Sequence, residues 1–344
     1  MAYSQPARAA TRWSGPTVCR ARRRRLLLGV ALAALLADTA GQLLNDSRHV
    51  RMPPARTRNG HRPIAAPAVS WPQQGQAALV LGNGRPAASP REQPAAIASL
   101  AKVMTAYLIL KRYPLSGAQD GFTIMITAAE AQAEAQDADL DQSVVAVRAG
   151  EQLTERQLLE ALLIPSGNNI ARLLANVVAG SQTRFLAEMN AEARTLGMDH
   201  TIYTDPSGWD PGTVSTAVDQ LRVFQLAMRF PIFRRIVSTP SVTLPVAGTL
   251  TNFHPLIADG YGGKTGSDSA ARGCLAFFTS ATVGGRPVTA VGVVMGQGQG
   301  RDTSAILAAA GDAATQLVES AAPAIPRSTV GSSAPAGASI GVAG

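Results

Sequence analysis

Apolar positions divide the chain into short runs near both ends of its central part and longer periodic runs between them. The apolar run 77–81, followed by the turn-forming pair Asn83-Gly84, predicts a strand and a turn. Segments of helical length follow at 100–110, 151–163, 170–178, 183–196 and 215–228. Strand-like runs return at 261–267, 273–278 and 288–295, and a last helix is predicted over 303–319. This order predicts an α+β fold: an antiparallel sheet, completed by the N-terminal strand and flanked by helices, with a helical subregion.

The segments outside this pattern define the predicted domain organisation. Residues 42–75 are rich in Arg, Pro and Asn without periodicity, and we expect a linker there. Residues 321–344 form a low-complexity tail of Ala, Pro, Ser and Gly. One domain is therefore expected over 76–320, a length within the range of single domains.

The N-terminal segment 1–41 has the pattern of a targeting sequence. The arginine run 22–25 precedes 12 apolar residues at 26–37, a stretch too short for a transmembrane helix and suited to a signal peptide. Asp38 makes the following small-residue stretch an imperfect cleavage site, so an uncleaved membrane anchor is the alternative. Either way we expect an exported protein, periplasmic or otherwise extracytoplasmic, with membrane contact only through this segment.

The net charge of +8 belongs to the N-terminal part of the chain rather than to the predicted domain. Residues 1–63 contain 12 arginines and two acidic residues, a balance of +10, so the rest of the chain carries a balance of −2. A nucleic-acid-binding module would be expected to carry a basic face within its fold. The charge distribution therefore disfavours nucleic acid as a partner.

Histidine and cysteine positions indicate neither a metal site nor another cofactor. The four histidines are scattered, with no pair at metal-ligand spacing. Of the two cysteines, Cys19 lies in the targeting segment. Cys274 stands in an apolar strand-like run, where we expect it to be a buried apolar residue.

Lysine is rare in this chain, which has three lysines against 28 arginines. Lysine can lose its proton when it is desolvated or placed near another cation, whereas a guanidinium stays charged. Lys102 follows Ser99 by three residues in an otherwise apolar helix, so the two side chains are expected on one helix face. Ser99, at the helix start, is therefore a candidate nucleophile, and Lys102 is a candidate general base.

Two further triplets carry side chains suited to acyl transfer. Ser166-Gly167-Asn168 is predicted in a loop at 165–169 and offers a hydroxyl and an amide. Lys264-Thr265-Gly266 is predicted on a strand, and the glycines around it indicate close approach of another backbone or a ligand. Each triplet is a weak signal by itself, because turns and edge strands use the same residues.

Together, the order and spacing of these triplets resemble those of the low-molecular-weight penicillin-binding proteins, the serine D-alanyl-D-alanine carboxypeptidases. Ser99 precedes Ser166 by 67 residues, and Ser166 precedes Lys264 by 98. The resemblance extends over 75–320 and includes AIASLAKVMTA at 96–106, GEQLT at 150–154 and LLIPSGNN at 162–169. The family often has Asp at the position of Asn169 and Leu at that of Trp209.

The resemblance implies a penicillin-binding/β-lactamase-like fold and acyl transfer to a serine. It implies that Ser99 attacks the D-Ala–D-Ala carbonyl of a peptidoglycan stem peptide and that Lys102 takes its proton. Ser166 and Lys264 would pass protons towards the leaving amine, and Asn168 would hold the substrate amide. The N–H groups of Ser99 and Ser267 would form an oxyanion hole. The substrate-binding residues implied are Thr265, Gly266, Ser267 and Arg301.

The same resemblance defines the expected partners and the alternatives. Peptidoglycan stem peptides are the expected substrates, and β-lactam antibiotics are the expected covalent inhibitors. The short chain also resembles the D,D-endopeptidases of the family, so cleavage of cross-links is the alternative activity. A class A β-lactamase adds a deacylating glutamate, but the loop 201–213 contains none, and Glu188 and Glu192 fit a predicted amphipathic helix. A catalytically silent wall-binding module is disfavoured because every side chain of the three motifs is present.

Overall fold

The structure, a computed structural model, describes residues 69–300 and 302–322. The predicted targeting segment 1–41, the linker residues up to 68, Arg301 and the tail from 323 lie outside the described residues. The described residues all belong to the unit 63–344.

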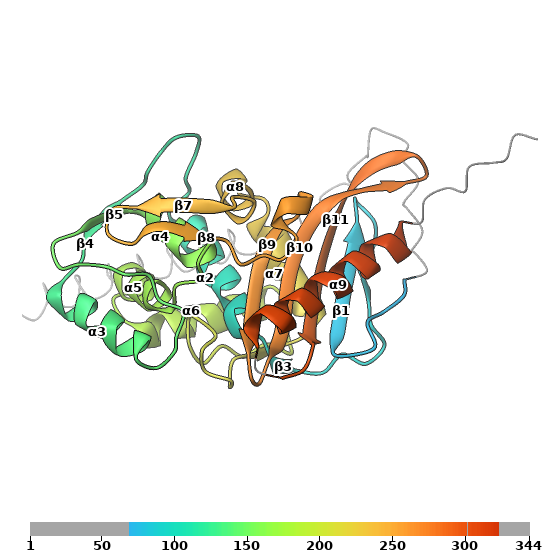
Figure 1. The fold of residues 1–344 in the computed structure, drawn as a ribbon, viewed down its shortest axis with the longest axis horizontal. Helices are drawn as coiled ribbons and strands as arrows, with labels where there is room; N and C mark the ends of the chain where they lie inside the picture. Colours follow the sequence, from blue (N-terminus) through green and yellow to red (C-terminus); the bar gives the residue numbers. More distant parts are fainter. Residues whose placement is uncertain (1–68, 301, 323–344) are drawn as a thin grey trace, which may run out of the picture. The chain divides into compact units, whose positions relative to one another are not determined.

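A five-stranded antiparallel sheet, in the order β2-β1-β11-β10-β9, forms the right-hand part of the fold in Figure 1. Its strands are β1 (Gln76–Leu81), β2 (Ala87–Ala88), β9 (Gly262–Asp268), β10 (Arg272–Val283) and β11 (Arg286–Gln297). β1 pairs with β11 so that Gln76 lies opposite Met295. The predictions of an α+β fold and of a C-terminal antiparallel sheet completed by the N-terminal strand are therefore confirmed.

Both faces of this sheet are buried. Successive side chains of a strand point to opposite faces, so one strand contributes side chains to two hydrophobic cores. In β1, Ala78 and Val80 belong to the larger hydrophobic core, which the sheet shares with the helical subregion. Leu79 belongs to a second core beneath α9 (Thr303–Ala321), the helix that crosses the sheet in Figure 1. The sheet is thus a rigid layer between α9 on one side and the other helices on the other.

The helical subregion surrounds the central helix α2 (Ala101–Arg112), which packs against α4, α5, α6 and α7. Immediately before α2, the short 3-10 helix η1 (Ala98–Leu100) packs against β9. The remaining helices of the subregion are α3 (Ala128–Ala138), α4 (Glu155–Leu163), α5 (Asn168–Ala179), α6 (Gln182–Thr195), α7 (Ala217–Ala227) and α8 (Pro231–Val237). The start of α2 therefore lies where the helices meet the sheet.

Short elements connect these layers. Three two-stranded pairs join β3 (Ala95–Ala96) to β6 (Val214–Ser215), β4 (Thr123–Met125) to β5 (Gln152–Thr154), and β7 (Ser241–Leu244) to β8 (Gly248–Thr251). A further 3-10 turn, η2 (Ile257–Asp259), precedes β9.

Capping residues explain where the helix boundaries differ from those predicted. The helix predicted from residue 151 begins at Glu155, because Thr154 caps it in a capping box with Gln157 and residues 152–154 pair as β5. Thr216 likewise caps α7, which starts at Ala217 rather than at residue 215. The predicted loop 165–169 was too long, since α5 already begins at Asn168.

Two helices, α3 and the short α8, were not predicted. The sequence of α3, AAEAQAEAQDA, has no apolar stripe, and none of its residues is buried. It forms from the high helix propensity of Ala, Glu and Gln and from a capping box between Thr127 and Glu130. Hydrophobic periodicity cannot detect a helix of this kind.

Within the described part of the chain, Cys274 is fully buried, which confirms the prediction for this residue, and burial raises the pKa of its thiol to about 12. No helix in the described ranges combines the length and apolar character needed to cross a membrane. The same residues contain no group of three or more His, Cys, Asp or Glu side chains arranged to hold a metal ion.

Candidate active site

Ser99 and Lys102 meet at the start of α2. Ser99 lies in η1, after Ala98, whose backbone is left-handed at φ 43°. Lys102 lies in the first turn of α2, and its Nζ is 2.6 Å from Ser99 Oγ. The prediction that these two side chains share a helix face is therefore confirmed.

Lys102 is completely buried, and its hydrogen-bond partners are all uncharged. Besides Ser99, its Nζ donates to Asn168 Oδ1 at 2.7 Å and to the carbonyl of Ser207 at 3.0 Å. Burial, and next the positive charge of Lys264, hold the pKa of Lys102 well below its ordinary value. A neutral amine has two N–H donors and one lone pair. In this structure Nζ donates to Ser99 Oγ as well. When the amine is neutral, the two carbonyl oxygens can accept its two N–H groups, and its lone pair can then accept the Ser99 hydroxyl proton.

The Ser207 carbonyl was not among the predicted site residues. A turn holds it in place, in which the Asp205 carboxylate accepts from the N–H groups of Ser207 and Gly208, both at 3.0 Å. Gly208 has φ 80°, and its Cα packs so closely against the Ala98 carbonyl that no side chain would fit there. The run Asp205-Pro206-Ser207-Gly208 is typical of a turn, which was the signal available in the sequence.

The second triplet contacts the third across the site. Ser166 precedes α5 with a left-handed backbone at φ 67°. Its hydroxyl oxygen accepts a hydrogen bond of 2.9 Å from Lys264 Nζ, which also donates to the Thr265 carbonyl at 2.8 Å. Lys264 is 1% exposed, and burial lowers the pKa of its ammonium group to about 7. Both lysines are therefore held where their charged forms are disfavoured.

Close backbone contact brings β9 against the nucleophile segment. A Cβ placed on Gly266 would lie 2.8 Å from the Ile97 carbonyl oxygen and 3.2 Å from the Ser99 nitrogen. The prediction that glycine here marks the approach of another backbone is thus confirmed. Thr265 is buried beside Gly266, and Ser267 follows in β9 opposite Gly273.

The structure thus brings together Ser99, Lys102, Ser166, Asn168, Lys264 and the strand residues Thr265, Gly266 and Ser267. Arg301, predicted to take part in substrate binding, lies outside the described residues.

Replacing Gly266 by alanine is expected to slow acylation of the protein by fluorescent penicillin by about tenfold or more, because β9 must move away from Ser99 to make room for the methyl group. The second-order labelling rate constant measures this effect. Gly284→Ala is the matched control: it places a side chain at a left-handed residue in the β10–β11 turn, where no atom lies within 4 Å. Equally slow acylation of both variants would show that the contact between β9 and the Ser99 segment is not what limits the reaction.

Burial of Lys264 also predicts a pH dependence of stability. Between its folded pKa of about 7 and its ordinary value near 10.4, the unfolded chain binds a proton that the folded chain has released. Stability relative to a Lys264→Met variant should therefore rise with pH above about 7, by up to about 1.4 kcal/mol per pH unit. Urea unfolding of both proteins at pH 6, 7 and 8 tests this. Parallel curves from pH 7 to 8 would show that Lys264 stays charged in the folded protein.

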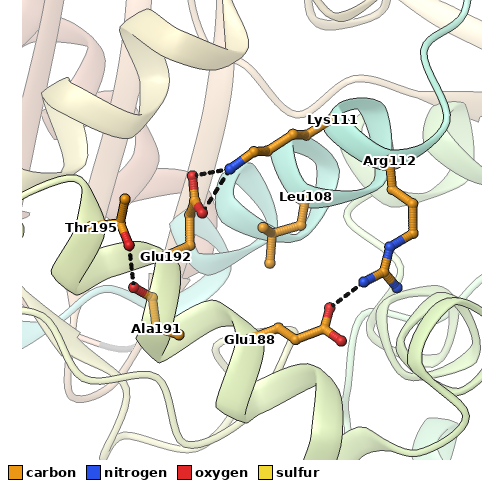
Figure 2. A pocket seen from close by; sticks show the side chains of 7 residues that line it. All are labelled: Leu108, Lys111, Arg112, Glu188, Ala191, Glu192 and Thr195. Atoms are coloured by element: carbon orange, nitrogen blue, oxygen red, sulfur yellow. Dashed lines mark hydrogen bonds and ion pairs between the residues drawn. The ribbon is translucent and has the colours of Figure 1, made fainter. Parts of the chain in front are cut away.

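A separate pocket of about 490 Å³ lies between α2 and α6 and is shown in Figure 2. Lys111 pairs with Glu192 at 2.7 Å, and Arg112 pairs with Glu188 at 3.0 Å. Lys111 follows Lys102 by nine residues, which places it about 13 Å further along the helix axis at 1.5 Å per residue. Glu188 and Glu192 are therefore engaged at the far end of α2, away from Ser99.

Comparison with known proteins identifies one family. The family model described as D-alanyl-D-alanine carboxypeptidase matches residues 87–298. The D-alanyl-D-alanine carboxypeptidase DacB2 of Mycobacterium tuberculosis is 37% identical over 198 residues, which cover 55% of this chain and 63% of that protein. The D-alanyl-D-alanine endopeptidase of Escherichia coli is 28% identical over 208 residues, covering 57% of this chain and 62% of that protein. The chain thus spans less than two thirds of the length of these curated relatives.

Solved structures have the same fold. The Streptomyces K15 DD-transpeptidase superimposes with a TM-score of 0.61 at 25% identity, covering 74% of this chain and 99% of that one. A penicillin-binding protein homolog from Mycobacterium tuberculosis gives a TM-score of 0.58 at 31% identity, covering 75% of this chain and 97% of that one. The predicted penicillin-binding/β-lactamase-like fold is therefore confirmed. Because the family model extends over all three triplets and the helices between them, the chain belongs to the D-alanyl-D-alanine carboxypeptidase family.

Proposed function

We propose that the protein is a serine D,D-carboxypeptidase, which removes the terminal D-Ala of peptidoglycan stem peptides through an acyl-enzyme on Ser99. The observation that carries this proposal is the buried amine of Lys102, 2.6 Å from Ser99 Oγ, with carbonyl oxygens opposite both of its N–H donors. Membership in the D-alanyl-D-alanine carboxypeptidase family supports the choice of substrate.

In the acylation step, Ser99 Oγ attacks the carbonyl carbon of the D-Ala–D-Ala bond while Lys102 Nζ accepts the hydroxyl proton. The backbone N–H groups of Ser99 and Ser267 would stabilise the oxyanion, a contribution of typically ~3 kcal/mol per donor. The close contact at Gly266 supports this assignment, because it holds β9 beside the nucleophile segment. The C–N bond then breaks, and water later releases the acyl group from Ser99.

The Ser166–Lys264 pair is proposed to deliver the proton that the leaving amine requires. The 2.9 Å hydrogen bond between Lys264 Nζ and Ser166 Oγ supports a path through the Ser166 hydroxyl. Lys264 and Thr265, with Arg301, would bind the carboxylate of the terminal D-Ala, and Asn168 would hold the substrate amide. A lysine is suited to both tasks because its charge responds to its surroundings.

Slow release of β-lactams is expected, in contrast to a class A β-lactamase. Asp205 lies in the loop 201–213, but its carboxylate accepts hydrogen bonds from the backbone N–H groups of Ser207 and Gly208. Glu188 and Glu192 are paired with Arg112 and Lys111. These contacts support a stable acyl-enzyme, so β-lactams should act as covalent inhibitors rather than substrates.

A D,D-endopeptidase is the second candidate function. It is favoured by the matches to proteins named D-alanyl-D-alanine endopeptidase, from Pseudomonas aeruginosa at 32% identity and from Escherichia coli at 28%. Both reactions use the same acyl-enzyme, and they differ in whether the leaving amine belongs to a free D-Ala or to a neighbouring stem peptide.

Incubation of the purified protein with monomeric pentapeptide muropeptides and with cross-linked dimers tests both functions. A carboxypeptidase shortens the monomers by one alanine, and an endopeptidase converts the dimers into monomers, as read by mass spectrometry. Ser99→Ala is the control for contaminating peptidases. Unchanged muropeptides of both kinds, together with no labelling by penicillin, would overturn the proposed function.

Export follows from the proposed substrate, because cross-linked peptidoglycan lies outside the cytoplasmic membrane. The arginine run and the apolar stretch 26–37 would direct this export, as a signal peptide or as an anchor. The N-terminal residue of the mature protein, determined by mass spectrometry, distinguishes the two: cleavage after the apolar stretch identifies a signal peptide.

A further inference from the structure

A glutamine outside the three triplets contacts the Asn168 amide. Asn168 Oδ1 accepts from Lys102 Nζ at 2.7 Å, and Asn168 Nδ2 donates to Gln142 Oε1 at 3.1 Å. Gln142 follows α3 and is half-buried. The two ends of the Asn168 amide therefore face two different partners, one at the candidate nucleophile and one outside it.

The amide of Gln142 is itself fixed at both ends. Its Nε2 donates to Asp137 Oδ1 at 3.1 Å, and its Oε1 also accepts from an Arg172 NH group at 3.3 Å. Asp137 and Arg172 form an ion pair with each other. Arg172 lies on α5, four residues after Asn168, so it projects from the same face of the helix. The oxygen of the Gln142 amide thus faces two donors, and its NH₂ group faces an acceptor.

Reversal of the Asn168 amide would break this matching twice. Its NH₂ group would then face the N–H donors of Lys102, and its oxygen would face Gln142 Oε1, which is also an acceptor. An amide has its donors and its acceptor at opposite ends, so the partner at one end selects the orientation of the other. Gln142 thus favours the orientation in which Asn168 accepts from Lys102.

We propose that Gln142 is a positioning residue for acylation, which holds the Asn168 amide with its oxygen towards Lys102, and that Asp137 and Arg172 hold Gln142 in turn. This inference rests on the proposed function, because it takes Lys102 as the base for Ser99. With Oδ1 engaged by Lys102 and one N–H by Gln142, the second N–H of Asn168 Nδ2 remains for the substrate amide.

Polar contacts orient the Gln142 side chain, although Val145, three residues further on, is buried in the core. α3 has no buried residue, and a cavity of about 110 Å³ lies between it and α5, lined among others by Asp137 and Arg172. Because α3 buries little apolar surface itself, the hydrogen bonds and the ion pair determine the orientation of the Gln142 side chain. The effect of a Gln142 substitution on acylation should therefore depend on which hydrogen-bond donors and acceptors the new side chain offers, rather than on its volume.

An exchange of donor and acceptor tests this polarity. Gln142→Glu keeps an acceptor for Asn168 but places a second carboxylate against that of Asp137. In the double variant Gln142→Glu/Asp137→Asn, the amide at position 137 donates to the carboxylate at position 142, and the total charge equals that of the parent. Gln142→Leu removes every hydrogen bond of the side chain. Gln136→Ala, an exposed position on α3 next to Asp137, is the matched control. Each protein is assayed for its second-order acylation rate constant with fluorescent penicillin and for its melting temperature.

Gln142→Leu and Gln142→Glu are each expected to acylate about tenfold more slowly than the parent, the effect of losing one well-placed hydrogen bond. The double variant is expected to recover most of this loss, and Gln136→Ala to match the parent. The inference is overturned if Gln142→Leu acylates like the parent, if the double variant is no faster than Gln142→Glu, or if Gln136→Ala is equally slow. A parent protein that does not react with penicillin at all would instead overturn the proposed function on which the inference rests.

Discussion

Replacing Ser99 by alanine is expected to abolish covalent labelling by penicillin and release of D-Ala. The substitution removes only the hydroxyl oxygen that would carry the acyl group, and alanine suits the start of a helix, so the fold should remain. Mass spectrometry of the intact protein after incubation with penicillin measures the expected loss of the adduct. The melting temperature controls for folding. An adduct of unchanged amount on the Ser99→Ala protein would place the nucleophile elsewhere.

Lys102→Arg is expected to slow acylation by about 10²–10⁴-fold, because a guanidinium keeps its positive charge and cannot accept the Ser99 proton. The measurement is the rate of penicillin labelling at several concentrations. Lys111→Arg is the matched control, since Lys111 lies on the same helix but is half exposed and paired with Glu192. Labelling of the Lys102→Arg protein within a few-fold of the parent would show that another group acts as the base.

Local contacts of the site could be predicted from sequence, whereas contacts between distant segments could not. Ser99 and Lys102 are three residues apart in one helix, so helix geometry alone brings them together. The contact between Ser166 and Lys264 joins residues 98 positions apart, and only the resemblance to a family indicated it. The penicillin-binding/β-lactamase-like fold was likewise predicted from the resemblance to a family alone. The family match and the solved structures confirm it.

Two contacts of the site could not be predicted from the sequence, for different physical reasons. The Ser207 carbonyl is a backbone group, and no residue type at position 207 encodes its direction, which depends on the turn around Asp205. Gln142 follows a helix without an apolar face, so neither periodicity nor a motif marked it. Asn168 was expected in a loop, but it occupies the first turn of α5, and its side chain contacts Lys102 and Gln142.

Two left-handed residues at the site bear on how the protein tolerates mutation. Ala98 and Ser166 adopt φ values of 43° and 67°, a region in which residues with a Cβ are strained by about 1–3 kcal/mol each. Glycine at either position would relieve that strain, so a selection for thermostability alone would favour it. At position 98 the relaxed backbone would hold Ser99 less rigidly, and at position 166 glycine would also remove the hydroxyl that Lys264 contacts. Directed evolution of this protein should therefore show activity and thermostability moving in opposite directions at these two positions.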